Sequence, residues 1–262
     1  ALANEPSLEE SLRARVLEVL HALAEPDQIR LIARPMRVFS ADSPEHATCR
    51  RLLGLLGGHT VDSLLEVLAD EPDMSARKAL VDLVTDLAPG YVLRLGERVS
   101  DPRWYFVRNV VSILGSTRDP ATVPYLGRTL RHADPRVRRE TIRALSNIRD
   151  RVSDELLMSA LTDDDSQNVQ LAARYLGVVG ARGAAPALVE VARGDGRGNR
   201  DIGPRVEAIE ALGRMRALDA VAALTDLSGR RSFLRSGRAR EIRAAADSAL
   251  AAIASAREEG TS

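Results

Sequence analysis

The sequence predicts an all-α fold, a right-handed α-solenoid of about seven helical hairpins that opens with an irregular N-terminal capping hairpin. Of its 262 residues, 45% are hydrophobic but only 3% are aromatic, so the core must be aliphatic. Ala, Leu, Arg and Glu, all good helix formers, dominate the composition. A ten-residue pattern also returns seven times along the chain, as expected of a repeat protein.

The chain is expected to form one solenoid domain, 1–262. Residues 1–44 are interpreted as the irregular N-terminal cap, 45–255 as the repeats and 256–262 as a disordered tail. Within the cap, LEESLRARVLEVLHAL predicts a first helix, and a shorter helix is expected after Pro26. At the other end, a helix starting at Ala239 is expected to close the solenoid.

The seven copies of the pattern carry apolar or small residues at their fifth, eighth and ninth positions. The copies begin at Thr48, Ala76, Phe106, Val137, Asn168, Pro204 and Ile242. Spacings of three and four place those positions on one face of a helix. The first copy is therefore expected to bury Leu52, Leu55 and Leu56.

Shorter apolar segments between the copies predict the other helix of each hairpin. They begin at Val61, Tyr91, Thr122, Ser153, Ala185 and Asp219. Asp-Pro pairs at 101–102, 119–120 and 134–135 predict an N-cap followed by proline at the first helical position. Glycines are expected to end helices at Gly57, Gly115, Gly177, Gly180 and Gly213.

The D-P-x-V-R pattern at 134–138, followed by spaced small residues and Leu, resembles the HEAT repeat. The form is the short bacterial one that is also found in phycobilin lyase-like proteins, and the resemblance covers roughly residues 45–255. It implies that arginines at the second position pair with turn aspartates such as Asp73 and Asp134, which holds each turn to the next helix. Those arginines are Arg77, Arg138, Arg205 and Arg243.

Stacked hairpins of this kind expose a concave groove lined by the second helices. The third position holds a cation in four successive copies, and the seventh position adds Arg143 and Arg174, so a basic stripe is expected on the groove wall. Trp104 and Tyr105 start one groove helix, and clustered Trp, Tyr and Arg are typical of binding hot spots. The predicted partner-binding residues are Trp104, Tyr105, Arg108, Asn109, Arg139, Arg143 and Arg174.

The stripe has an alternative interpretation. Neighbouring acids such as Asp82 and Glu140 would balance its charge and make it an ordinary solvated face. Among the aromatic residues, Phe106 is expected to pack in the core.

A second candidate patch lies in the connection 228–238. It could bind phosphate or an acidic surface, and the alternative is that it is only a mobile loop. It consists of Arg230, Arg231, Phe233, Arg235 and Arg238.

Charge and cysteine content narrow the class of protein. Thirty-seven basic and thirty-seven acidic residues give a formal net charge of zero, which removes the bulk attraction on which dedicated nucleic-acid binders rely. The single cysteine, Cys49, cannot form an intramolecular disulfide, and no apolar run approaches the length of a membrane span. We therefore expect a cytoplasmic protein, and the start at Ala1 allows for a processed or excised piece.

The sequence carries none of the common catalytic or cofactor motifs, so we predict no catalytic residue, no metal and no cofactor. His46 and Cys49 fall three apart, with His59 further on, but a closed metal site needs about four ligands. The acidic run 163–165 lacks the spacing of a calcium loop and predicts a turn with an N-cap.

The function that fits best is a non-catalytic protein-binding module or scaffold within a larger bacterial assembly. It would capture a partner protein or an acidic peptide in its groove. One alternative is a DNA-binding or alkylpurine-glycosylase-like HEAT solenoid, in which Asp101 beside Trp104 would act on DNA. The other, implied by the resemblance, is a bilin lyase-like chaperone subunit.

Overall fold

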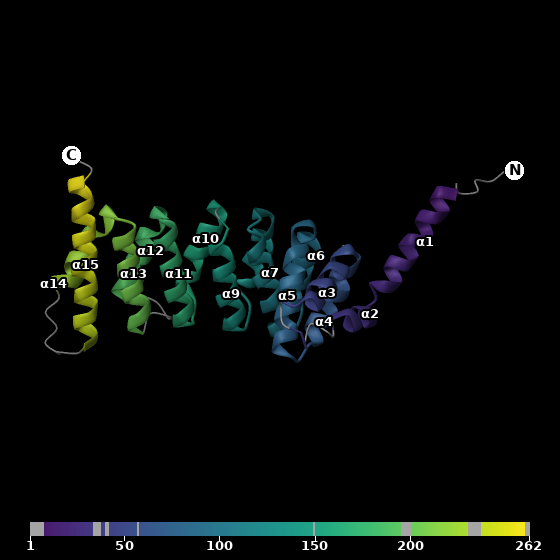
Figure 1. Cartoon of the computed structure of the whole chain (residues 1–262). Coiled ribbons are helices and arrows are strands. Elements are labelled where there is room, and N and C mark those ends of the chain that lie inside the picture. The colour runs from purple at the N-terminus through teal and green to yellow at the C-terminus, as the bar shows by residue number, and fades with distance from the viewer. Residues whose placement is uncertain are drawn as a thin grey trace. The chain divides into compact units, whose positions relative to one another are not determined.

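The structure is a computed structural model that describes residues 8–33, 38–39, 42–56, 58–148, 150–194, 201–229 and 237–259. Within those ranges every regular element is a helix (Figure 1), which confirms the all-α class. The chain divides into two compact units, Ala1–Thr117 and Arg118–Ser262. The extent of a single domain over 1–262 stays a prediction.

The first unit holds the N-terminal helices and two stacked rows of repeat helices. Helices α3, α5 and α7 pack in succession, and α4 packs against α2 and α5. The helices are α1 (Leu8–Leu23), α2 (Pro26–Ala33), α3 (Pro44–Leu55), α4 (His59–Asp70), α5 (Met74–Leu87), α6 (Val92–Glu97) and α7 (Trp104–Thr117). Two 3-10 turns, η2 (Ala88–Gly90) and η3 (Arg98–Ser100), flank α6.

The second unit is a stack of hairpins with two layers. One layer, here the long-helix layer, contains α9 (Pro135–Ser146), α11 (Ser166–Val179), α13 (Ile202–Arg214) and α15 (Gly237–Glu259). The short-helix layer contains α8 (Val123–Thr129), α10 (Arg151–Ser159), α12 (Ala185–Arg193) and α14 (Val221–Gly229), each with a 3-10 turn at one end. Each long helix packs against the next long helix along the chain and against the short helix that precedes it, which confirms the solenoid type of stacking.

The repeat pattern correctly identifies the buried face in the later copies. Val110, Ile113 and Leu114 in α7 are fully buried. So are Ala208, Ala211 and Leu212 in α13. The apolar stripe of these copies therefore forms the core, as predicted.

The first copy is an exception, because its predicted register is wrong. Leu52 is 48% exposed and Leu55 is 75% exposed, whereas Leu53 and Leu56 are buried. Helix α3 starts its row and has a row neighbour, α5, on one side only. Its buried face is correspondingly narrow, and it includes His46 in place of the two predicted leucines.

The predicted caps are largely confirmed, whereas several glycines have another role. Asp119, Asp134 and Asp165 each accept a hydrogen bond from a backbone N–H at the start of the following helix. Gly180 ends α11 with a φ of 72°, as predicted. Gly115, Gly177 and Gly213 instead lie buried inside helices, and Gly57 lies outside the described residues.

The predicted N-terminal hairpin is present as α1 and α2, but α1 covers little of the core. It contacts α2, and Leu12, Val16 and Val19 along it are at least half exposed. At the other end, α15 extends to Glu259, so the tail expected from 256 begins inside a helix.

None of the described helices combines the length and the apolar character that crossing a membrane requires.

Substitution of Leu176 tests whether the predicted apolar stripe stabilises the core. It is fully buried in α11, so Leu176→Ala should lower the free energy of unfolding by about 2–5 kcal/mol through the cavity it leaves. Leu218, in the same unit, is 57% exposed, and Leu218→Ala should stay within about 0.5 kcal/mol of the wild type. Urea unfolding measures both, and equal losses would show that the buried stripe is misplaced.

Candidate partner-binding surface

The predicted stripe is divided between the two units. Trp104, Tyr105, Arg108 and Asn109 lie in the first half of α7, in the first unit. Arg139 and Arg143 lie in α9 and Arg174 lies in α11, all in the second unit. The predicted residues therefore form two separate groups, one in each unit.

The aromatic group starts α7. The rings of Trp104 and Tyr105 meet edge to face, with centroids 5.9 Å apart, and Tyr105 is 41% exposed. Phe106 is buried, as expected, and the guanidinium of Arg103 lies 5.3 Å from the centre of its ring. Arg108 is exposed and Asn109 is half-buried. Tyr105 and Arg108 are thus open to solvent in this unit, whereas Phe106 belongs to the core.

Asp101, the residue of the glycosylase-like alternative, is held by its own turn. Its carboxylate accepts hydrogen bonds from the backbone N–H of Arg103 at 2.8 Å and from Arg103 Nε at 3.0 Å and Nη2 at 2.9 Å. The side-chain hydrogen bond from Arg103 is the main cause that lowers the pKa of Asp101. The carboxylate is therefore committed to a structural ion pair.

Arg139 and Arg143 are both paired with acceptors of the second unit. Arg139 Nη2 lies 3.1 Å from Asp165 Oδ1, and its Nε donates to Asn168 Oδ1 at 3.2 Å. Arg143 Nη1 donates to Glu140 Oε2 at 3.2 Å within α9. Arg139 thus ties α9 to the start of α11, while Arg143 stays half exposed.

A three-residue cluster joins α11 to α13. Arg174 donates from Nε at 3.1 Å and from Nη2 at 2.8 Å to Oε2 of Glu207, and Arg214 Nη2 donates to Oε1 at 2.7 Å. The side chain of Glu207 is only 6% exposed, whereas those of Arg174 and Arg214 are 53% and 37% exposed. A buried carboxylate therefore fixes two guanidinium groups at the surface. We name these residues the Glu207 cluster.

The ionisation of Glu207 follows from this geometry. Burial opposes the charged form, but hydrogen bonds from Arg174 and Arg214 outweigh burial and lower the pKa of Glu207. Sequence reasoning identified Arg174 but missed Glu207 and Arg214. The sequence did contain one indication of Glu207. It occupies the fourth position of its copy of the repeat, and Glu140 occupies the same position of an earlier copy.

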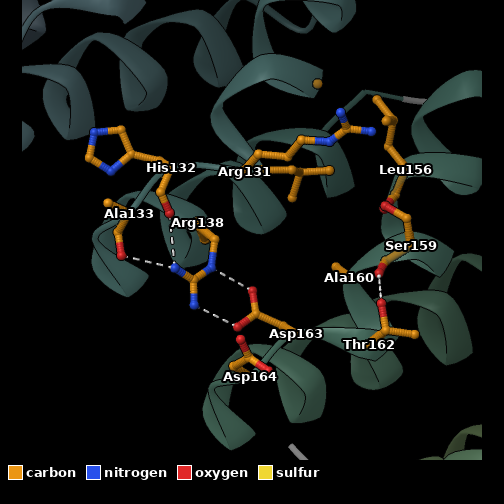
Figure 2. A pocket seen from close by; sticks show the side chains of 12 residues that line it. Arg131, His132, Ala133, Arg138, Leu156, Ser159, Ala160, Thr162, Asp163 and Asp164 are labelled. Atoms are coloured by element: carbon orange, nitrogen blue, oxygen red, sulfur yellow. Dashed lines mark hydrogen bonds and ion pairs between the residues drawn. The ribbon is translucent and has the colours of Figure 1, made fainter. Parts of the chain in front are cut away.

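The turn arginines do hold the turns, but their partners differ from those implied by the resemblance. Arg138 donates to the carbonyls of His132 and Ala133 at 2.9 and 3.1 Å and forms a two-point ion pair with Asp163 (Figure 2). Arg77 similarly donates to the carbonyl of Glu71 at 2.8 Å. The turn arginines thus bind mainly backbone carbonyls. We call the contacts of Arg138 with the two carbonyls and with Asp163 the Arg138 clip.

The turn aspartates instead serve as helix caps. Asp134 accepts from the backbone of Arg136 and pairs with its guanidinium at 2.7 Å, which lowers the pKa of Asp134 to about 2. Asp73 caps α5 through the backbone N–H of Ala76. Asp73 and Asp134 are therefore caps, and the turn aspartate that pairs with a second-position arginine is Asp163, which binds Arg138.

The second candidate patch falls mostly on residues that the structure does not describe. Arg230, Arg231, Phe233 and Arg235 lie outside the described residues, and Arg238 is exposed in the first turn of α15. The patch stays a prediction.

The cysteine lies in the first unit. Cys49 is half-buried in α3, and burial raises the pKa of its thiol. Across the described ranges, no three His, Cys, Asp or Glu side chains gather in a way that could hold a metal ion.

Comparison with family models accounts for the repeats. Residues 92–177 match the model of HEAT repeats, and residues 204–229 match the model of the PBS lyase HEAT-like repeat. These two stretches of the chain carry HEAT-type repeats. The two stretches correspond to α6–α11 and to α13–α14, so the HEAT repeats are the hairpins described above.

No curated protein matches the chain. Human deoxyhypusine hydroxylase in complex with glycerol is 19% identical, with 96% of this chain and 93% of that chain covered and a TM-score of 0.44. The complex of CpcE and CpcF of phycocyanin lyase from Nostoc sp. is 20% identical, with 95% and 98% covered and a TM-score of 0.38. An engineered protein is 22% identical, with 79% and 96% covered and a TM-score of 0.46. None of these similarities says what this chain binds.

Substitution of Asp163 tests how much the Arg138 clip stabilises the fold. Burial opposes its ionisation, but hydrogen bonds led by that from Arg138 lower its pKa, so its charge stabilises the fold above the unfolded pKa of about 3.9. Asp163→Asn should cost about 1.5–3 kcal/mol at pH 7, and this difference from the wild type should shrink as the pH falls below that value.

Its neighbour Asp164 is exposed and provides the control. Asp164→Asn should leave the free energy of unfolding within about 0.5 kcal/mol of the wild type at either pH. Urea titrations at pH 7 and pH 3 measure both variants. Equal losses for the two would mean that general charge, and not the Arg138 clip, stabilises the turn.

Proposed function

We propose that the chain is a non-catalytic protein-binding module or scaffold of the bacterial cytoplasm. Its partner would be a protein with an acidic or mixed-charge surface, held on the exposed face of α9, α11 and α13. The Glu207 cluster is the observation that carries this proposal. It presents two arginines in fixed positions on neighbouring helices of one unit.

Fixed arginines suit the recognition of carboxylates. A free arginine side chain loses conformational entropy when a partner orders it, whereas one that is already anchored loses less. Arg174 uses Nε and Nη2 on Glu207, which leaves Nη1 for a partner carboxylate. Arg143, half exposed on α9, extends the same face.

The local charge favours a protein over nucleic acid as the partner. Arg143, Arg174 and Arg214 each lie beside a carboxylate of Glu140, Glu207 or Glu210. A face balanced in this way lacks the excess of positive charge that phosphate backbones require. The commitment of Asp101 to Arg103 likewise supports a non-catalytic role over the glycosylase-like alternative.

A pull-down with two matched variants tests the proposal. Arg143→Gln with Arg174→Gln should abolish capture of a partner protein from a lysate, because both remove cations from the proposed face. Glu207 keeps Arg214 as a partner in that variant, so we expect the fold to persist. Far-UV circular dichroism and urea unfolding check this.

The control removes the same charge from the short-helix layer. Arg151 in α10 is 88% exposed and Arg193 in α12 is 43% exposed, so Arg151→Gln with Arg193→Gln should retain the partner. Equal loss in both variants would contradict a specific face. Recovery of nucleic acid that nuclease removes would favour the DNA-binding alternative instead.

A further inference from the structure

Two positions of the repeat face the preceding long helix in the second unit. A Cβ atom added at Gly177 of α11 would lie 2.7 Å from the Cβ of Ala211 in α13. Gly213 of α13 approaches Ala249 of α15 in the same way, at 3.0 Å. Ala211 and Ala249 hold the eighth position of their copies, and the fifth position lies on the same helix face. The helix that comes before therefore covers the fifth and eighth positions.

Helix α3 keeps large apolar residues at these two positions, although it is the first helix of its row. Leu52 at the fifth position is 48% exposed, and Leu55 at the eighth is 75% exposed. In the copies on α5, α7, α9 and α13 the residues at both positions are buried. Two exposed leucines at positions that a helix covers elsewhere indicate that α3 receives another helix on this face.

The last copy of the repeat, on α15, ends in the opposite way. The sixth position is apolar and buried in α3, α7, α9, α11 and α13, and in α3 it is Leu53. On α15 the sixth position is Asp247, which is exposed. Terminal repeats of a solenoid usually turn such a polar face to water. Leu52 and Leu55 are not polar, so the outer face of α3 is not a terminal cap of this kind.

Helix α1 carries an apolar stripe of the kind that this face would receive. Leu12, Val16, Val19 and Leu23 follow one another at spacings of four, three and four, which places them on one face of the helix. They are between 42% and 64% exposed. Helix α1 packs against α2 and extends away from α3 (Figure 1). The first unit thus contains both an exposed helical stripe and an exposed surface for a helix.

The junction between α1 and α2 opposes a return of α1 to its own α3. Only Ala24 and Glu25 separate these helices, whereas residues 56–58 separate α3 from α4. The N–H of Ala24 donates to the carbonyl of Leu20, and the carbonyl of Glu25 accepts from the N–H of Ile29. Helical hydrogen bonds thus reach into the junction from both sides. Turning α1 back would break them, whereas α1 of a second copy approaches α3 with the junction intact.

We propose that two copies of the chain associate by exchanging α1, so that the stripe around Val16 of each copy covers Leu52 and Leu55 of the other. Such an exchange is symmetric and makes the same contact twice. One contact between two helices is small beside the roughly 1,200–2,000 Å² that a stable interface buries, and the repetition doubles it. The inference is independent of the proposed partner face on α9, α11 and α13.

Sedimentation of the full chain over a range of concentrations tests the exchange. The wild type should sediment as a dimer. Leu55→Glu in α3 and Val16→Glu in α1 should each raise the dissociation constant of the dimer by about tenfold or more, because each would bury a charge without a partner in both contacts. A wild type that is monomeric at every concentration would overturn the exchange.

An equimolar mixture of the two variants distinguishes the exchange from other ways of pairing. One contact stays intact in the mixture, between α1 of the Leu55→Glu chain and α3 of the Val16→Glu chain. The mixture should therefore dimerise more strongly than either variant alone, and a mixture no more dimeric than its components would contradict the proposal. So would a dimeric Leu55→Glu, as expected if α1 paired with α1, or a dimeric Val16→Glu, as expected if α3 paired with α3.

Leu93→Glu is the matched control, because Leu93 lies on α6 of the same unit and is 65% exposed. Its dissociation constant should stay within about twofold of the wild type. Far-UV circular dichroism should show equal helix content in all three variants, which separates loss of the contact from misfolding. An equal loss of dimer in Leu93→Glu would refute the α1–α3 contact. The pull-down with Arg143→Gln and Arg174→Gln involves neither helix, so failure of the exchange would leave the proposed function standing.

Discussion

Each long helix of the second unit buries its apolar stripe only because the next helix lies close against it. Gly177 makes this closeness visible, since a Cβ atom there would lie 2.7 Å from the Cβ of Ala211. Gly213 meets Ala249 of α15 in the same way. Small residues at these crossings let the backbones approach, and the core of one hairpin is therefore completed by its neighbour. This dependence explains why the pattern must recur in register along the chain.

The same closeness places the charged groups. Arg174 reaches Glu207 from the neighbouring helix, and Arg138 reaches Asp163 in the following turn. Both carboxylates are nearly buried, so their charges are stable only because arginine donates to them at two points. Arginine thus has two roles here. It fastens turns through backbone carbonyls, and it presents fixed cations at the surface.

The formal net charge of the chain is zero, and charges are also balanced locally in the second unit. Arg143 on α9 pairs with Glu140, Arg174 on α11 and Arg214 on α13 share Glu207, and Arg138 is balanced by Asp163. A surface of this kind attracts partners only weakly through its net charge. It discriminates between partners through the positions of individual charged groups.

The spacing of apolar residues determined the helical class, the hairpins and most of the core, because burial of a helical stripe needs little more than its period. It failed at Leu52 and Leu55, where α3 has a row neighbour on one side only. The sequence also indicated Arg139, Arg143 and Arg174 as surface cations. Only the tertiary structure decided their partners and the burial of Glu207. Each of these depends on how closely two helices approach, and that distance is set by packing between segments far apart in the chain.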